Sequence, residues 1–179
     1  TRYIPKKVVP SLNGFFSEKV AIIGAGPAGL SCAFYLAEKG YSPVIFEKNE
    51  KPGGMLRYGI PSFKLEKDVI DAEIDIIKAM GVEIKCGIEV GKDVTLDELR
   101  AQGYKAFYIA IGCQGGRKAG IPGEDAEGVM TAVDFLRTVG ADESYPVTGK
   151  AVVVGGGNVA IDVARTAQRC GAESVAMFC

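Results

Sequence analysis

The chain of 179 residues contains no histidine. This absence excludes catalysis by a histidine acid or base and most metal sites that use imidazole ligands. The formal net charge is only −1, so no broad basic field favours nucleic acid or an anionic membrane as a partner. The apolar runs are strand-sized, too short for a transmembrane helix, and residues 1–17 lack the apolar segment of a signal peptide.

Cysteine is scarce and scattered. The five cysteines are Cys32, Cys86, Cys113, Cys170 and Cys179. No two of them have the spacing of a metal site or of a redox-active pair, so we predict no metal centre. We interpret them as reduced thiols of a cytoplasmic protein, packed as small hydrophobic side chains.

Short apolar runs alternate with amphipathic segments along most of the chain. We expect strands at 19–23, 43–46, 82–90 (with a break at Gly87), 106–111, 150–154 and 174–178, and helices at 27–39, 65–80, 96–101, 131–139 and 158–170. Thr95 and Glu98 have the spacing of a capping box at the start of the third of these helices. The alternation predicts an α/β fold with a parallel, doubly wound sheet.

A glycine-rich turn follows the first predicted strand and leads into the first helix. It contains Gly24, Gly26 and Gly29, and Glu47 closes the next strand. In a dinucleotide-binding unit the first glycine permits the tight turn, the second admits the pyrophosphate, and the third allows the helix to pack closely on the strand. Glu47 would accept hydrogen bonds from both hydroxyls of an adenosine ribose. The alternative is a glycine turn in a sheet that binds nothing.

A second turn of this kind lies near the other end of the sequence. Gly155, Gly156 and Gly157 follow an apolar strand, and Ala160 takes the place of the third glycine. The same physical argument applies, because backbone N–H groups at a helix N-terminus bind phosphate. Two such turns predict two dinucleotides, a flavin and a nicotinamide. The residue type at about Phe178, Cys179 or just beyond would choose between NADH and NADPH.

The segment after Glu47 favours the flavin for the first turn. Gly53 and Gly54 follow this acid at a distance that resembles the E-x5–7-GG extension of two-domain FAD and NAD(P) flavoproteins. More specifically, the blocks 53–65, 108–112, 121–136 and 155–162 resemble, in order, those of the NADPH-dependent glutamate synthase small subunit family. Relatives with the same blocks are the N-terminal part of dihydropyrimidine dehydrogenase and a subunit of bifurcating ferredoxin:NADP oxidoreductases.

The resemblance implies a set of FAD contacts. They are Gly24, Ala25, Gly26, Pro27, Ala28 and Gly29 in the first turn, Glu47 and Lys48 at the adenosine end, Gly54, Met55 and Leu56 along the cofactor, Val90 at the adenine, and Gly112 near the pyrophosphate. Lys64 would face a phosphate or a flavin oxygen, or else be a solvated loop lysine. The resemblance makes the second turn an NADPH site, with contacts at Gly155, Gly157, Asn158 and Val159, while Asp162 anchors the loop or lies near the cofactor.

The resemblance also implies an organisation. Residues 1–18 would be an arm, 19–140 an incomplete Rossmann-like FAD-binding domain, and 141–179 the truncated start of a Rossmann-like NAD(P)-binding domain. We expect hydride to pass from NADPH to FAD in the full-length enzyme, with no catalytic side chain needed and little activity in this chain alone. Electrons would pass to a glutamate synthase large subunit or another acceptor through an iron–sulfur domain that this sequence lacks. The alternatives are the subunits of the two related enzymes named above, or a non-catalytic FAD-binding module.

Overall fold

The computed structural model describes residues 15–179, so most of the predicted arm at 1–18 lies outside the described residues. By its internal contacts the chain divides into two compact units. Unit 1 holds residues up to Arg57 together with 66–113, and unit 2 holds residues 58–65 together with 114–179. The backbone therefore passes between the units three times. No helix among residues 15–179 is long and apolar enough to cross a bilayer.

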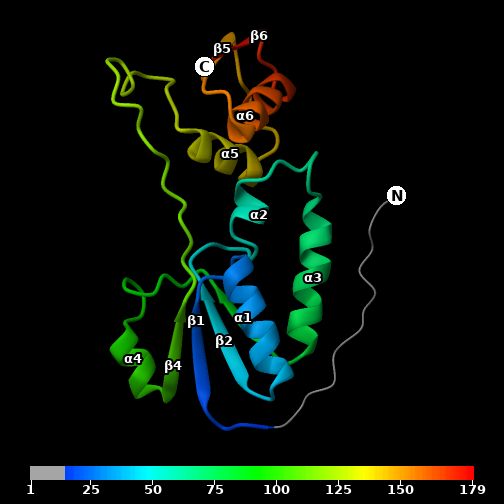
Figure 1. The fold of residues 1–179 in the computed structure, drawn as a ribbon, viewed down its shortest axis with the longest axis vertical. Coiled ribbons are helices and arrows are strands. Elements are labelled where there is room, and N and C mark those ends of the chain that lie inside the picture. Colours follow the sequence, from blue (N-terminus) through cyan, green and yellow to red (C-terminus); the bar gives the residue numbers. More distant parts are fainter. Residues whose placement is uncertain (1–14) are drawn as a thin grey trace. The chain divides into compact units, whose positions relative to one another are not determined.

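Unit 1 is built on a parallel sheet of four strands in the order β3-β2-β1-β4 (Figure 1). These strands are β1 (Lys19–Ile23), β2 (Ser42–Glu47), β3 (Glu83–Cys86) and β4 (Tyr104–Ile109). The central strands β1 and β2 are buried almost throughout, as expected for parallel strands covered on both faces. The parallel sheet predicted from the alternating pattern is confirmed.

Four helices belong wholly or largely to unit 1. They are α1 (Pro27–Glu38), α2 (Met55–Tyr58), α3 (Lys67–Ala79) and α4 (Leu96–Ala101). Helix α3 presents Ile70, Ile74 and Ile77 as one buried stripe, the arrangement that apolar residues three and four apart produce. Figure 1 shows α1 beside β1 and β2, and α4 beside β4. The short helix α2 lies in a stretch that the sequence predicted as loop.

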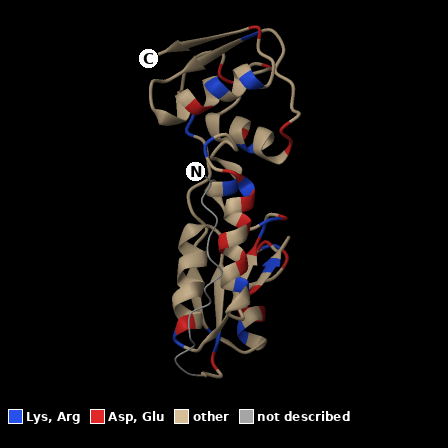
Figure 2. Ribbon diagram, turned by 90° about the vertical axis from the view of Figure 1, so that its right-hand side faces the viewer, with Lys and Arg blue, Asp and Glu red and all other residues tan. Residues whose placement is uncertain are grey.

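Unit 2 contains a two-stranded parallel sheet, β5 (Lys150–Val154) and β6 (Ser174–Phe178), with helices α5 (Ala132–Ala141) and α6 (Asn158–Arg169). Phe135, Leu136 and Ala167 form its buried cluster, which joins α5 to α6. This packing differs from the predicted boundary at residue 140, which would separate α5 from α6. Figure 2 shows acidic and basic positions interspersed along the ribbon of both units.

Candidate functional site

The carboxyl edge of the unit 1 sheet gathers residues from neighbouring strands. Gly24 directly follows β1, Glu47 ends β2, and Ala110 follows β4. Gly24 N–H donates to Phe46 O at 2.8 Å, and Ala110 N–H donates to Ile23 O at 2.8 Å. Because parallel strands end at one edge, ligands of such sheets bind there. The first glycine turn, Glu47 and the segment before Gly112 thus lie at the edge where the sequence predicted the flavin.

The glycines of the first turn are required by its geometry. Gly24 has φ +104°, and a Cβ at this position would lie 2.4 Å from Ala110 O. A Cβ at Gly29 would lie 1.9 Å from Gly24 O, so any side chain there would push α1 away from the strand. Gly26 differs: a Cβ there would meet only Gly54 Cα, at 3.8 Å. Its missing side chain therefore leaves the surface of the turn open to a ligand.

The N-terminus of α1 is open to an anion. Its N-cap is Gly26, no side chain caps it, and its first turn holds no acidic residue. Helices α4 and α5, in contrast, are capped by Thr95 and Thr131 and carry acidic residues in their first turns. Free N–H groups and the positive end of the helix dipole stabilise a phosphate. Helix α3 also lacks a side-chain cap, but it carries Asp68 in its first turn, whereas the first turn of α1 holds no acid.

Glu47 holds the first glycine turn in place. Its side chain is 4% exposed, and its Oε2 accepts from Ala25 N–H at 2.7 Å. Its Oε1 accepts from the backbone N–H of Asn49 at 2.9 Å and from Asn49 Nδ2 at 2.6 Å. Because each carboxylate oxygen has about two acceptor positions, only Oε2 has one left. One ribose hydroxyl can bind directly, and a second would have to displace the Asn49 side chain.

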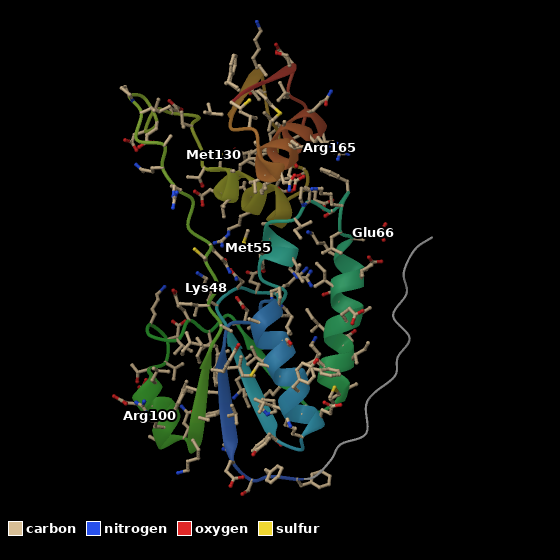
Figure 3. The ribbon with its side chains drawn as sticks, in the orientation of Figure 1. Lys48, Met55, Glu66, Arg100, Met130 and Arg165 are labelled. Atoms are coloured by element: carbon tan, nitrogen blue, oxygen red, sulfur yellow. The ribbon has the colours of Figure 1, made fainter. Side chains whose placement is uncertain are left out.

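The remaining predicted flavin contacts of unit 1 lie on nearby segments. Lys48 is exposed just beyond β2, and Met55 begins α2 (Figure 3). Val90 follows β3 and forms an isolated bridge with Val94. Gly112 has φ +68° in the segment after β4. Pro27, Ala28 and Leu56 lie in the first turns of α1 and α2. Their contacts with a cofactor stay a prediction.

The loop that contains Gly53 and Gly54 packs on the first glycine turn. Gly53 N–H donates to Ala25 O at 2.8 Å, and a Cβ on Gly54 would lie 2.7 Å from Gly26 Cα. Gly54 also has φ +53°, a conformation that favours glycine. The glycine pair that resembled a flavin-binding extension is therefore packed directly on the glycine turn.

Unit 2 repeats the local geometry of the first turn. Gly155 N–H donates to Phe178 O at 2.7 Å, as Gly24 N–H does to Phe46 O. Helix α6 has Gly157 as its N-cap, with no side-chain cap and no acidic residue in its first turn. A Cβ at Gly157 would meet nothing within 4 Å, so the space before Asn158 and Val159 is open. This geometry fits a second dinucleotide phosphate.

The two turns differ at the residue that follows the second strand. Cys179 follows Phe178 as Glu47 follows Phe46, so Cys179 takes the position of the acid. A Cβ at Gly156 would lie 3.0 Å from Cys179 Cβ, which places the thiol side chain over the turn. A thiol supplies no carboxylate to bind a ribose hydroxyl or to repel a 2′-phosphate. At this position the second turn therefore has no counterpart of Glu47.

Lys64 forms an ion pair within unit 2. Its Nζ lies 2.6 Å from Asp162 Oδ1, and the Asp162 side chain is largely buried while that of Lys64 is 42% exposed. The neighbouring residues of the same segment also contact other parts of unit 2. Ser62 donates to Glu143, and the Phe63 ring lies 4.7 Å from the Arg165 guanidinium and 4.1 Å from that of Arg169. Asp162 thus anchors a loop, one of the two roles considered for it.

Arg57 is a residue that sequence reasoning missed. It is only 5% exposed although it is charged, and its Nε donates to Pro52 O at 2.6 Å. Its Nη2 forms an ion pair with Asp71 of α3. A charged residue soon after a glycine pair is typical of a solvated loop, and nothing in the sequence signals that α2 turns it inward.

In unit 1 a glycine turn, a buried acid and an uncapped helix lie at the carboxyl edge of a parallel sheet. Unit 2 repeats the glycine turn and the uncapped helix. These features define a protein with two dinucleotide-binding turns. Residues 18–178 match the family model described as pyridine nucleotide-disulphide oxidoreductase. The chain belongs to this family. Membership confirms the predicted Rossmann-like fold and, at the level of the family, the predicted cofactor pair of FAD and NADPH.

Curated relatives agree with the resemblance drawn from the motifs. The chain is 50% identical over 161 residues to the NADP(+)-dependent formate dehydrogenase subunit beta of Moorella thermoacetica, covering 88% of this chain and 23% of that protein. It is 41% identical to the glutamate synthase [NADPH] small chain of Escherichia coli, covering 97% and 40%. The NAD-dependent dihydropyrimidine dehydrogenase subunit PreT of Escherichia coli O157:H7 is 46% identical, with 88% and 38% covered.

Among solved structures, Mycobacterium tuberculosis FprA in complex with NADPH matches with a TM-score of 0.73 at 26% identity. The match covers 89% of this chain and 43% of that one. The chain thus spans between about a quarter and two fifths of the length of these curated relatives. A glutamate synthase small chain and a dihydropyrimidine dehydrogenase subunit, both named in the resemblance, are thus among the proteins that the chain is similar to.

Proposed function

We propose that the chain is the part of an NADPH-dependent flavoprotein oxidoreductase that holds FAD in unit 1 and begins the NADPH site in unit 2. The observation that carries the proposal is the repeated turn: two strands, two glycine turns with the same N–H···O bond, and two uncapped helix N-termini. When bound, the flavin accepts a hydride from the nicotinamide and passes electrons onward.

The residues of the chain would bind and orient rather than react. The N–H groups at the start of α1 would hold the flavin pyrophosphate, and the free acceptor position of Glu47 Oε2 would hold a ribose hydroxyl. Gly155, Gly157, Asn158 and Val159 would hold the NADPH pyrophosphate. With Cys179 in the acid position, a 2′-phosphate meets no carboxylate from this residue, which favours NADPH.

The acceptor of the electrons is a further part of the proposal. The family resemblance favours an electron-accepting partner subunit, such as the large subunit of glutamate synthase, reached through an iron–sulfur domain. A second candidate is an NADP-linked formate dehydrogenase, because the chain is more similar to that beta subunit than to the glutamate synthase small chain, at 50% against 41% identity.

The absorption spectrum of the purified protein tests the proposal. We expect the 179-residue chain to take up FAD and become yellow, and the full-length protein to lose this colour rapidly on anaerobic addition of NADPH and more slowly with NADH. A matched control is Gly29→Val, in which the new side chain meets Gly24 O and displaces α1. A chain that folds but takes up no FAD would contradict the assignment of unit 1. A yellow full-length protein that NADPH does not reduce would instead favour a non-catalytic flavin-binding module.

A further inference from the structure

The guanidinium of Arg57 is buried next to the glycine pair of unit 1. Burying a charge costs free energy unless the charge is paired and hydrogen-bonded. Arg57 meets both conditions: it forms an ion pair with Asp71, and its Nε donates to Pro52 O at 2.6 Å. Arg57 is buried while the Asp71 side chain is 58% exposed, so loss of Asp71 would leave a buried charge without its ionic partner. The ion pair and the bond to Pro52 O together fix the loop before α2 to helix α3.

The loop that Arg57 holds is also fixed on its other side. A Cβ at Gly53 would lie 3.2 Å from Arg57 Cβ and 3.4 Å from its Nε. On the opposite side, Gly53 N–H donates to Ala25 O, and Gly54 packs against Gly26. The turn 52–54 is therefore enclosed between the Arg57 side chain and the first glycine turn.

We propose that Arg57 is a positioning residue of the flavin site, which rests on the proposed function of unit 1. It holds the carbonyl of Pro52 and thereby presses Gly53 and Gly54 onto Ala25 and Gly26. This fixes the opening at Gly26 through which the pyrophosphate reaches the start of α1. Because only 5% of Arg57 is exposed, it acts on FAD through the backbone of residues 52–54.

The substitution Arg57→Lys tests whether FAD binding depends on the hydrogen bond from Arg57 to Pro52 O or only on the positive charge at this position. The ammonium of the substituted side chain keeps the charge that pairs with Asp71, but it lacks the planar Nε–H that donates to Pro52 O. We expect Arg57→Lys to weaken FAD binding by about 10-fold, the order of effect of losing one charge-assisted hydrogen bond. Asp71→Asn should weaken FAD binding less, because the bond from Arg57 to Pro52 remains.

Arg100→Ala is the matched control in the same unit. Arg100 pairs with Asp97 at 2.6 Å on α4, and both side chains are exposed. Figure 3 shows Arg100 on α4, apart from Met55 on α2. Its removal should leave FAD affinity unchanged.

The experiment titrates the wild-type chain and the three variants with FAD and follows the quenching of flavin fluorescence, well below their melting temperatures. The near-ultraviolet and visible circular dichroism of the bound flavin is recorded as well, because a changed ring or chain position alters it while a mere loss of stability does not. We expect a weaker, altered complex for Arg57→Lys and an unaltered one for Arg100→Ala. If Arg57→Lys does not fold, Asp71→Asn carries the test alone, with the same two readouts and a smaller expected loss.

Three outcomes would count against the proposal. Arg57→Lys with wild-type affinity and an unchanged dichroism spectrum would overturn the role of Arg57 and leave the proposed function standing. FAD binding that weakens only in parallel with the fall in melting temperature, with an unaltered dichroism spectrum, would also overturn the role of Arg57. A wild-type chain that folds and binds no FAD would contradict the proposed function itself, and the role of Arg57 with it.

Discussion

The five thiols fall into two groups at the scale of single residues. Cys113 and Cys179 are exposed, whereas Cys32, Cys86 and Cys170 are partly buried. Burial raises the pKa of these three thiols, because it disfavours the thiolate, and the negative charge of Glu47 raises the pKa of Cys86 further. Since the thiolate is the reactive form, the two groups should differ in reactivity.

We expect iodoacetamide at about pH 8, near the usual pKa of a thiol, to label Cys113 and Cys179 first. As the pH rises further, the labelling of Cys86 should accelerate, because burial raises its pKa and its thiolate forms above the usual pH range. Mass spectrometry of timed digests measures both rates. Labelling of Cys86 as fast as that of Cys113 would contradict the prediction. Because burial raises the pKa of these three thiols in the folded state, the stability that the neutral thiols contribute is fully present below their pKa in the unfolded state. It is lost as the pH rises through their pKa in the folded state.

Single residues of the site could be predicted only where their role follows from the backbone. Gly24 and Gly29 could be identified from spacing alone, because a turn between strand and helix leaves no room for a side chain. Glu47 was placed correctly at the end of β2, yet its three protein donors could not be foreseen. Lys64 pairs with Asp162, a residue far along the chain that no local pattern connects to it.

Helix α4 shows how one side chain secures an element. It is short, and Leu99 is its only buried residue, with no exposed surface. Leu99 packs in the cluster that includes Ala21, Phe46 and Tyr104. The capping box of Thr95 and Glu98 fixes where the helix begins, and this cluster fixes which face turns inward.

Leu99→Ala should therefore destabilise unit 1 by about 2–5 kcal/mol, the usual cost of emptying such a core position. Ala101→Ser, at an exposed position of the same helix, should change stability by less than about 0.5 kcal/mol. Urea denaturation followed by circular dichroism measures both. Equal midpoints for the two variants would show that α4 is not part of the cooperative core.

Most elements could be predicted from periodicity, because long amphipathic stretches such as α3 leave little choice. The bounds of β1, β5 and α4 agree with the sequence-based ranges. Helix α2 was missed because it is a single turn among glycines and prolines, held by tertiary contacts of Arg57 rather than by its own pattern. The break predicted at Gly87 within 82–90 is confirmed, because β3 spans Glu83–Cys86 and the chain turns at Gly87, which has φ +72°.

At the scale of the whole chain, a long exposed connection runs from β4 to α5. Residues 114–130 form no helix or strand, and most of their side chains are exposed. Exposed segments of this kind are preferred sites of proteolysis. Arg117 and Lys118 lie within it, while Lys85 lies on a strand paired to β2.

Limited digestion with trypsin should therefore cut first after Arg117 or Lys118. The double variant Arg117→Gln, Lys118→Gln should slow this first cut markedly, and mass spectrometry of the early products identifies the sites. A first cut after Lys85 or Lys105, at an unchanged rate in the double variant, would contradict the prediction.

The division of the chain could not be predicted from the sequence order of its motifs. The motif order suggested one boundary near residue 140, whereas residues 58–65 and α5 pack with α6. The contacts of Phe63 with Arg165 and Arg169 join residues 58–65 to α6. Because these partners lie far apart in the sequence, no local pattern predicts their contact.

The interrupted order of the units has a consequence for synthesis on the ribosome. Proteins emerge from the N-terminus onward, and contiguous domains can fold as they appear. Here residues 58–65 are made well before Glu143, Asp162 and the two arginines that contact them. The loop must wait without these partners while the rest of unit 1 folds around its two ends. A chain that ended after residue 113 would contain strands β1 to β4, but its segment 58–65 would lack the contacts that residues 114–179 supply.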